Sequence, residues 1–169
     1  MARGQQSTRV ALFVVFSTFL VWPAQPQNSA DAREKTLSGH ATGAFDVKTS
    51  PLTLSEQSTD PKLGRMSIEK QYHGALEATA KGEMLTAQSE RKDSGVYVAV
   101  ERVTGTLNGK KGSFAMHHTG VMNRAKPELK ISVVPDSGTD DLQGLSGTMH
   151  IRIESGKHFY DFDYSLPAK

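Results

Sequence analysis

The sequence predicts an all-β protein, a small antiparallel β-barrel of about eight strands preceded by an export leader. Three observations support this. Apolar and polar residues alternate with a period of two in one segment after another from residue 37 onward. Short turn sequences rich in Gly, Asn, Ser and Pro separate these segments at close spacing. Glycines also occur inside the segments, as coiled barrel strands require at positions where a Cβ would not fit.

The composition fits one folded domain and excludes several functions. The chain has 169 residues, of which 37% are hydrophobic and 22% charged. It has no cysteine, which excludes disulfides, thiolate metal sites and cysteine nucleophiles. Arg3 and Arg9 are the only charged residues among the first 24, and the rest of the chain has equal numbers of basic and acidic residues. A basic surface for nucleic acid or for an anionic membrane is therefore not expected.

Residues 1–24 predict a signal peptide. Two arginines precede an apolar run over residues 10–22, which is shorter than the about 20 residues that span a bilayer. Small residues predict cleavage between residues 24 and 32, and an uncleaved anchor is the alternative. Residues 25–36, rich in Pro, Gln, Ser and Ala, predict a disordered linker, and residues 37–168 the barrel. The expected location is the periplasm or the exterior.

The first strand is predicted at residues 37–47, where it ends before Ser50-Pro51. Residues 49–64 are rich in Ser, Thr, Pro and Asp and predict a loop, with a short extended piece at 52–54 as an option.

Residues 66–88 predict a hairpin that turns at His73-Gly74. A helix over residues 74–85 is the alternative, because Ala, Glu, Lys, Met and Leu are good helix formers. Gly82 and the alternation favour a strand.

The second half of the chain predicts a hairpin, a single strand and a final hairpin. Asn108-Gly109 suits a tight turn that requires positive φ, and Ser155-Gly156 turns the last hairpin. The strands are expected at residues 96–107, 113–122, 129–133, 148–154 and 158–166, with loops at 123–127 and 135–144.

Three runs of this sequence together resemble the bacterial domain-of-unknown-function 3224 family. They are GRMSIEKQYHGALEATAKGEML, ERVTGTLNGKKGSFAMHHTG and VVPDSGTDDLQGLSGTMHIRIESGKHFYDFDYSL, and the resemblance covers about residues 37–166. It implies a small antiparallel barrel similar to allene oxide cyclase, and it implies no activity. The matching residues include Lys70, Gly74, Gly82, Tyr97, Glu101, His118, Gly120, His158 and Tyr160. The leader is a departure, because such proteins are typically short and lack one.

Alternation also indicates which polar residues enter the barrel, because a polar residue among apolar neighbours of its own face points inward. The six candidate ligand-pocket residues are Lys70, Tyr97, Glu101, His118, His158 and Tyr160. Burying such groups unpaired is costly, so they should pair with one another or with a ligand. One hypothesis is an internal polar network with a Lys70–Glu101 ion pair, and the other is a pocket in the barrel mouth.

The function expected from these features is binding of a small, largely apolar molecule in the barrel. One alternative is an isomerase or cyclase in which Glu101 or His118 acts as base or acid and Lys70 or Tyr97 stabilises negative charge. Another is a structural or interaction protein with a filled barrel. A void lined by Tyr97, His118 and Tyr160 would favour binding over this last alternative.

No cofactor or metal site is expected. His117 and His118 are adjacent, so they point to opposite faces of a strand and cannot chelate one ion together. The acidic run 136–141 lacks the ligand pattern of a calcium loop. The expected partner is a small hydrophobic ligand, with no nucleic acid and, after removal of the leader, no membrane. A homo-oligomer is compatible with the sequence.

Overall fold

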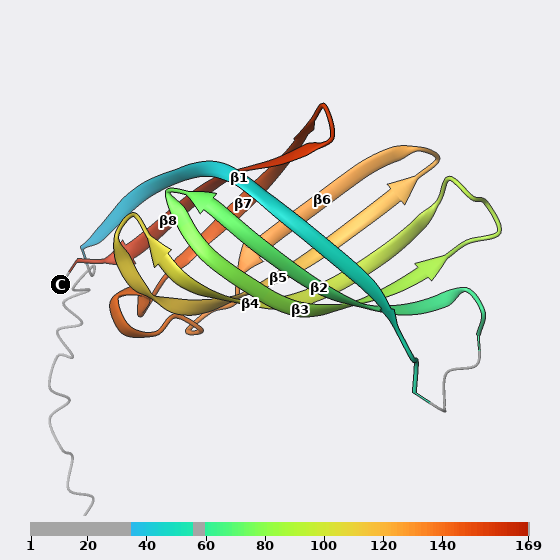
Figure 1. Ribbon diagram of the computed structural model, residues 1–169, viewed down its shortest axis with the longest axis horizontal. Coiled ribbons are helices and arrows are strands. Elements are labelled where there is room, and N and C mark those ends of the chain that lie inside the picture. The colour runs from blue at the N-terminus through green and yellow to red at the C-terminus, as the bar shows by residue number, and fades with distance from the viewer. Residues whose placement is uncertain (1–34, 56–59, 169) are drawn as a thin grey trace, which may run out of the picture. The chain divides into compact units, whose positions relative to one another are not determined.

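The computed structural model describes residues 35–55 and 60–168, which form a closed antiparallel barrel with strands in sequence order (Figure 1). The predicted signal peptide and nearly all of the predicted linker lie outside these residues. The elements are β1 (Thr36–Leu52), β2 (Leu63–Gly74), β3 (Leu76–Gln88), β4 (Gly95–Leu107), β5 (Lys110–Asn123), β6 (Lys126–Val133), the 3-10 turn η1 (Asp140–Leu142), β7 (Ser146–Glu154) and β8 (Lys157–Pro167). The eight strands confirm the predicted fold class.

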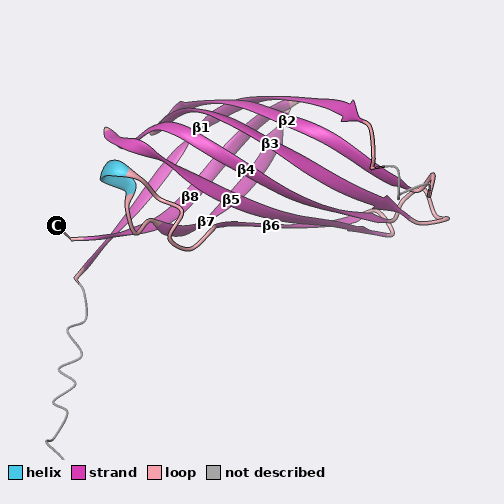
Figure 2. Ribbon diagram, turned by 90° about the horizontal axis from the view of Figure 1, so that it is seen from below, coloured by secondary structure: helices cyan, strands magenta, loops and turns pink. Residues whose placement is uncertain are grey.

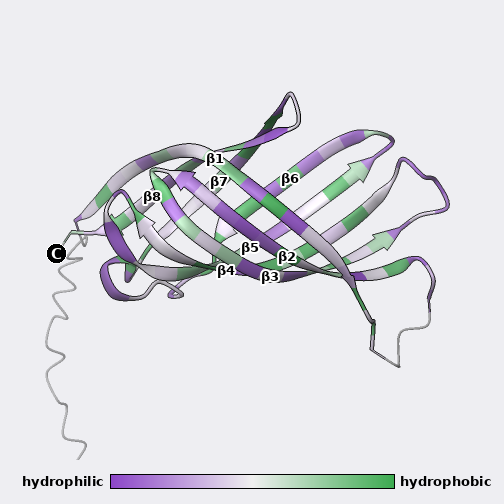
Figure 3. Cartoon of the chain, in the orientation of Figure 1, coloured by the Kyte–Doolittle hydropathy of each residue, from purple (hydrophilic) through white to green (hydrophobic). Residues whose placement is uncertain are grey.

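Hydrophilic and hydrophobic residues alternate along several strands (Figure 3), and the alternation of buried and exposed residues gives each such strand an inward and an outward face. In β3, Ala78 and Ala80 are buried, whereas Thr79 and Lys81 are exposed. This period of two is that of a strand with one face on the core, so the helix alternative for residues 74–85 is wrong. Packing against β2 and β4 outweighs the helix propensity of these side chains.

The first strand is longer than predicted, because β1 continues through Ser50-Pro51 to Leu52. Pro51 pairs with Met66 of β2, whereas the pairing of β1 with β8 stops at Phe45 and His158. Beyond Phe45, β1 is therefore an edge strand on its β8 side. A proline is tolerated there, because its missing N–H leaves no ladder bond unmade.

Three of the four tight turns follow the predicted glycines. Gly74 has a φ of 104°, and both Asn108-Gly109 and Ser155-Gly156 have positive φ at each residue. The fourth is a correction, since the predicted loop 123–127 is a two-residue turn at Arg124-Ala125, with φ of 50° and 63°. Neither residue is a usual one for such a turn, so composition did not reveal it.

One end of the barrel, here called the closed end, is covered by the connection between β6 and β7, which contains η1 (Figure 2). Thr139 donates its backbone N–H to the Ser113 carbonyl (2.9 Å), and the Ser137 hydroxyl accepts from the Ala115 N–H (3.0 Å). The connection thus pairs with β5 where β6 does not. Leu142 and Leu145, both 1% exposed, fill this end of the core.

The opposite end, here called the open end, carries the β1–β2, β3–β4, β5–β6 and β7–β8 connections (Figure 1). Among the described residues, the β6–β7 seam has one strand pair, Ser132–Thr148, whereas the β5–β6 ladder has eight. The β7–β8 hairpin diverges from β6 beyond that pair (Figure 1). As a result, inward-facing Leu129 and Ile153 remain 37% and 66% exposed.

Candidate functional site

A buried polar cluster lies inside the barrel around Glu101 of β4. The Lys70 ammonium donates to Glu101 Oε1 at 2.9 Å, and His118 Nε2 lies 3.1 Å from the same oxygen. The Tyr72 hydroxyl lies 3.3 Å from both Lys70 Nζ and Glu101 Oε1. The side chains of Lys70, Glu101 and His118 are at most 5% exposed. The expected internal ion pair between Lys70 and Glu101 is thereby confirmed.

Strand register explains why these side chains meet. Glu101 shares the inward face of β4 with Ala99 and Val103, both of which are buried. His118 pairs with Ala99 across the β4–β5 ladder, which places it one inward position from Glu101. Lys70 comes from β2, two strands away, and its long side chain reaches the carboxylate; its Nζ also lies 5.4 Å from the centroid of the Phe45 ring.

The cluster keeps Glu101 ionised. Desolvation by burial would raise the pKa of this carboxyl, but the hydrogen bonds and charges of His118 and Lys70 together lower it below its ordinary 4.5. Burial first, and then the Glu101 charge, raise the pKa of Tyr72 well above 10.0. Tyr72 is therefore protonated and can donate a hydrogen bond.

The two oxygens of Glu101 differ in their surroundings. Oε1 is within hydrogen-bond distance of Lys70, His118 and Tyr72. Oε2 is buried and has no hydrogen-bond partner among the residues that the structure describes. A buried carboxylate oxygen without a donor is costly, so this atom has a free acceptor position for a water molecule or a ligand.

A pocket of about 390 Å³ lies at the open end, between the β3–β4 loop, the end of β5 and the start of β6. Tyr97 lines it from the inward face of β4, together with Gly120, where a Cβ would overlap the Tyr97 ring. The remaining lining combines aliphatic side chains, among them Val121, Met122 and Leu129, with polar and charged ones. The charged residues of the lining are Arg91, Lys92 and Glu128. This volume falls within the range of small-molecule sites.

Tyr97 connects the pocket with the polar cluster. It lies two inward positions from Glu101 on β4, and burial followed by the Glu101 charge raises its pKa above 10.0. Glu101 and His118 are not among the residues that line this pocket in the described chain, so they lie behind Tyr97 rather than in the pocket wall.

Two of the six candidate ligand-pocket residues, His158 and Tyr160, do not line the pocket at the open end. The Tyr160 hydroxyl accepts the Leu76 N–H (2.8 Å) and donates to the His73 carbonyl (3.2 Å), which fixes the β2–β3 turn. His158 packs its ring against Phe45 with 5.2 Å between centroids. The pocket at the open end therefore does not join Tyr97 with His118 and Tyr160 as predicted, and Tyr160 is fully buried in the core.

Sequence reasoning missed two parts of this site. Tyr72 shares the inward face of β2 with Lys70, and this alternation could have identified it. The sequence did not identify aliphatic pocket residues such as Leu129. A half-exposed leucine at the open end follows the same period-two pattern as a buried one, so the pattern does not distinguish a pocket residue from a core residue.

The described residues contain no group of three or more His, Cys, Asp or Glu that could hold a metal ion. Within the same residues, no helix is long and apolar enough to cross a membrane.

These features define an antiparallel barrel with a buried ionic cluster and a pocket at its open end. The family model for a protein of unknown function, DUF3224, matches residues 41–164, so the chain belongs to the DUF3224 family. The chain is also similar to a crystal structure of a DUF3224 protein of unknown function from Shewanella oneidensis MR-1. The two are 42% identical with a TM-score of 0.71, over 79% of this chain and 100% of that one. No curated protein matches this chain.

Proposed function

We propose that this protein binds a small, largely apolar molecule in the pocket at the open end of the barrel. The observation that carries this proposal is the pocket of about 390 Å³, in which Tyr97 and aliphatic side chains such as Val121, Met122 and Leu129 form an apolar part of the lining. Small-molecule sites combine an apolar lining with a few polar groups that fix orientation. Here the Tyr97 hydroxyl, which is protonated at neutral pH, and the charged side chains of Arg91, Lys92 and Glu128 supply the polar groups.

A neutral apolar dye, Nile red, provides the first test. Leu129→Lys places a charge in the pocket lining and should weaken dye binding at least about tenfold, measured by fluorescence titration. Ile153→Lys is the matched control, because Ile153 is also an exposed inward aliphatic residue at the open end but does not line the pocket. Equal dye binding by the wild type and Leu129→Lys would overturn the proposal.

Native mass spectrometry identifies the natural ligand. The protein purified from its own host should carry an adduct that Tyr97→Ala weakens, and the adduct mass gives the ligand class. A protein that carries no adduct and shows no Leu129-dependent dye binding would support the filled-barrel alternative, in which the interior is structural.

The leader supports a second part of the proposal, which is export to the periplasm or the exterior. Residues 1–24 have the arginines, the apolar run and the small residues of a signal peptide. Intact-mass analysis of the exported protein should give a chain that begins between residues 25 and 33. A mass that includes residues 1–22 would overturn cleavage.

One observation favours isomerase or cyclase activity as an alternative. Glu101 is ionised, and its buried Oε2 has no hydrogen-bond partner in the described chain, so this oxygen can accept a proton. The natural ligand from the adduct distinguishes binding from turnover. An isomerase would convert that compound into a chromatographically distinct isomer of equal mass, and Glu101→Gln would abolish this conversion. Recovery of the unchanged compound from the wild type would exclude the reaction.

A further inference from the structure

Three charged side chains line the pocket at the open end, and two of them already have a partner of opposite charge. Arg91 donates from Nε and Nη2 to the two carboxylate oxygens of Asp93, at 3.1 and 2.9 Å. Glu128 Oε1 lies 2.9 Å from Lys130 Nζ. Each of these pairs is electrically neutral, so neither requires a charged group on a ligand to balance it.

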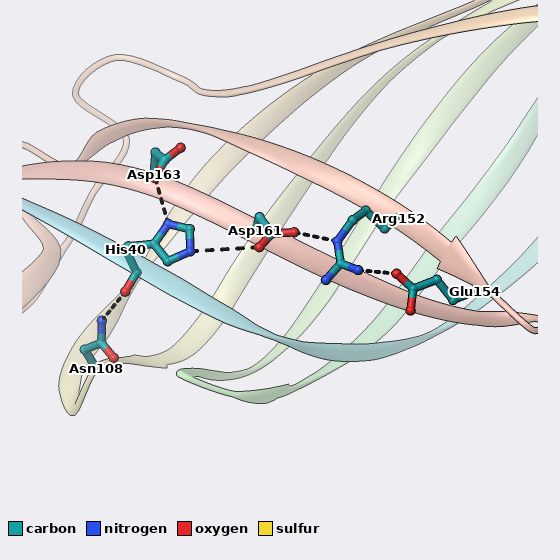
Figure 4. Close-up of polar contacts among 6 residues, drawn as sticks. All are labelled: His40, Asn108, Arg152, Glu154, Asp161 and Asp163. Atoms are coloured by element: carbon teal, nitrogen blue, oxygen red, sulfur yellow. Dashed lines mark hydrogen bonds and ion pairs between the residues drawn. The ribbon is translucent and has the colours of Figure 1, made fainter.

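The third charged side chain, Lys92, has no such partner. It is exposed, and it makes no hydrogen bond or ion pair with any residue that the structure describes. Arg152 shows the contrasting case on the outward face of β7 and β8, where it contacts both Asp161 and Glu154 (Figure 4). An ammonium group without a partner at the wall of a pocket can donate charge-assisted hydrogen bonds to an anionic ligand.

The neighbouring β5–β6 turn adds two further basic residues. Arg124 of this turn donates its backbone N–H to Ser94 Oγ at 3.0 Å, so the turn lies against the β3–β4 connection that carries Lys92. The side chains of Arg124 and Lys126 are exposed, and they also have no partner within the described part of the chain. Three unpaired basic residues therefore come from two adjacent connections at one side of the pocket mouth.

The two segments that form this side of the mouth carry more basic than acidic residues. Residues 89–94 and 123–130 contain five basic and three acidic residues. All three acidic residues are in ion pairs, which are Glu90–Lys62, Asp93–Arg91 and Glu128–Lys130. None of the described residues of the β1–β2 connection, Asp60 among them, lines the pocket. The electrostatic potential on this side of the mouth is therefore positive and favours an anionic group over a cationic one.

The same pocket has an apolar part that includes Val121, Met122 and Leu129. An apolar wall beside an unpaired cation matches a molecule that has a hydrocarbon chain and one anionic head. We propose that the ligand of this pocket is such an amphiphile. Lys92 binds its anionic head, and the chain packs against Tyr97 and Leu129. This inference rests on the proposed function and specifies the class of ligand.

The test uses decanoate and decanol, two probes with the same chain, as competitors of Nile red at about pH 7.5 and low ionic strength. Decanoate is ionised and decanol is neutral, so a change that affects only decanoate reports the contact with the head. Lys92→Glu should weaken decanoate binding at least about tenfold and change decanol binding less than about twofold. Lys111→Glu is the matched control, because it makes the same charge change at an exposed lysine of the closed end.

The outcomes separate this inference from the proposed function. Nile red binding that does not depend on Leu129 would overturn both. If that dependence holds, three results would overturn the anionic head alone. They are failure of decanoate to displace the dye, equal effects of Lys92→Glu and Lys111→Glu on decanoate, and equal weakening of decanoate and decanol by Lys92→Glu. Binding to phosphatidylglycerol vesicles that requires Lys92, without displacement of the dye by decanoate, would assign the basic residues to a bilayer surface instead.

Discussion

The two ends of this barrel use the same alternation of side chains with different results. At the closed end, Leu107, Leu142 and Leu145 are at most 1% exposed, because the β6–β7 connection covers the core. At the open end, Leu129 and Ile153 also face inward but remain 37% and 66% exposed. A connection that inserts leucines therefore decides which inward residues become core, and the uncovered end retains a pocket.

The polar cluster lies between these two regions, and breaking it should have the largest effect. Glu101→Gln leaves the Lys70 ammonium buried without its carboxylate, which should reduce the free energy of unfolding by about 3–5 kcal/mol. The double variant Lys70→Met/Glu101→Gln removes the unpaired charge and should recover most of this loss. Urea denaturation measures both.

Glu83→Gln is the matched control, because it removes an exposed carboxylate from an ion pair with Arg65. Its cost should stay below about 1 kcal/mol. Equal losses for Glu101→Gln and Glu83→Gln would show that the buried cluster does not stabilise the fold more than a surface pair does.

The comparison of the two ends can be tested directly with matched leucine truncations. Leu142→Ala removes a buried side chain and should reduce stability by about 2–5 kcal/mol. Leu129→Ala removes a partly exposed side chain and should cost less than about 1 kcal/mol. Thermal and urea denaturation provide the measurement. Similar costs would indicate that Leu129 is covered in solution, for example by a bound ligand.

Acid stability should distinguish the ionised cluster from the rest of the barrel. The pKa of Glu101 in the folded protein is lowered below 4.5. Its contribution to the free energy of unfolding is therefore complete above that pH and is lost as the pH falls from 4.5 toward the folded-state pKa. The melting temperature of the wild type should therefore drop more between neutral pH and about pH 3.5 than that of Glu101→Gln. Asp161, whose pKa is lowered chiefly by its hydrogen bond with Arg152, contributes equally to both proteins. If the melting temperatures of the wild type and Glu101→Gln fell in parallel with pH, ionised Glu101 would not be the source of the acid sensitivity.

The sequence predicted the strands and the inward direction of Lys70, Glu101 and His118, because both follow from local alternation. It did not distinguish Tyr97 at the pocket from Tyr160 in the filled core, since both alternate in the same way. Their depth depends on strand register and on the folding of the β6–β7 connection. Those are contacts between residues far apart in the chain, which a period-two pattern does not report.

One tight turn at the open end differs from the other three tight turns, and this predicts the smallest effect. Asn108-Gly109 at the closed end suits positive φ, whereas Arg124-Ala125 at the open end holds two ordinary residues at φ of 50° and 63°. Replacing the pair with Asn-Gly should therefore stabilise the barrel by up to about 1 kcal/mol, measured by urea denaturation. The backbone N–H groups of Arg124 and Ala125 donate to Ser94 Oγ (3.0 Å) and the Asp93 carbonyl (2.9 Å), and both bonds survive the substitution. Destabilisation instead would mean that the Arg124 and Ala125 side chains make contacts worth more than the strain, and this turn would then be as well adapted as the one at Asn108-Gly109.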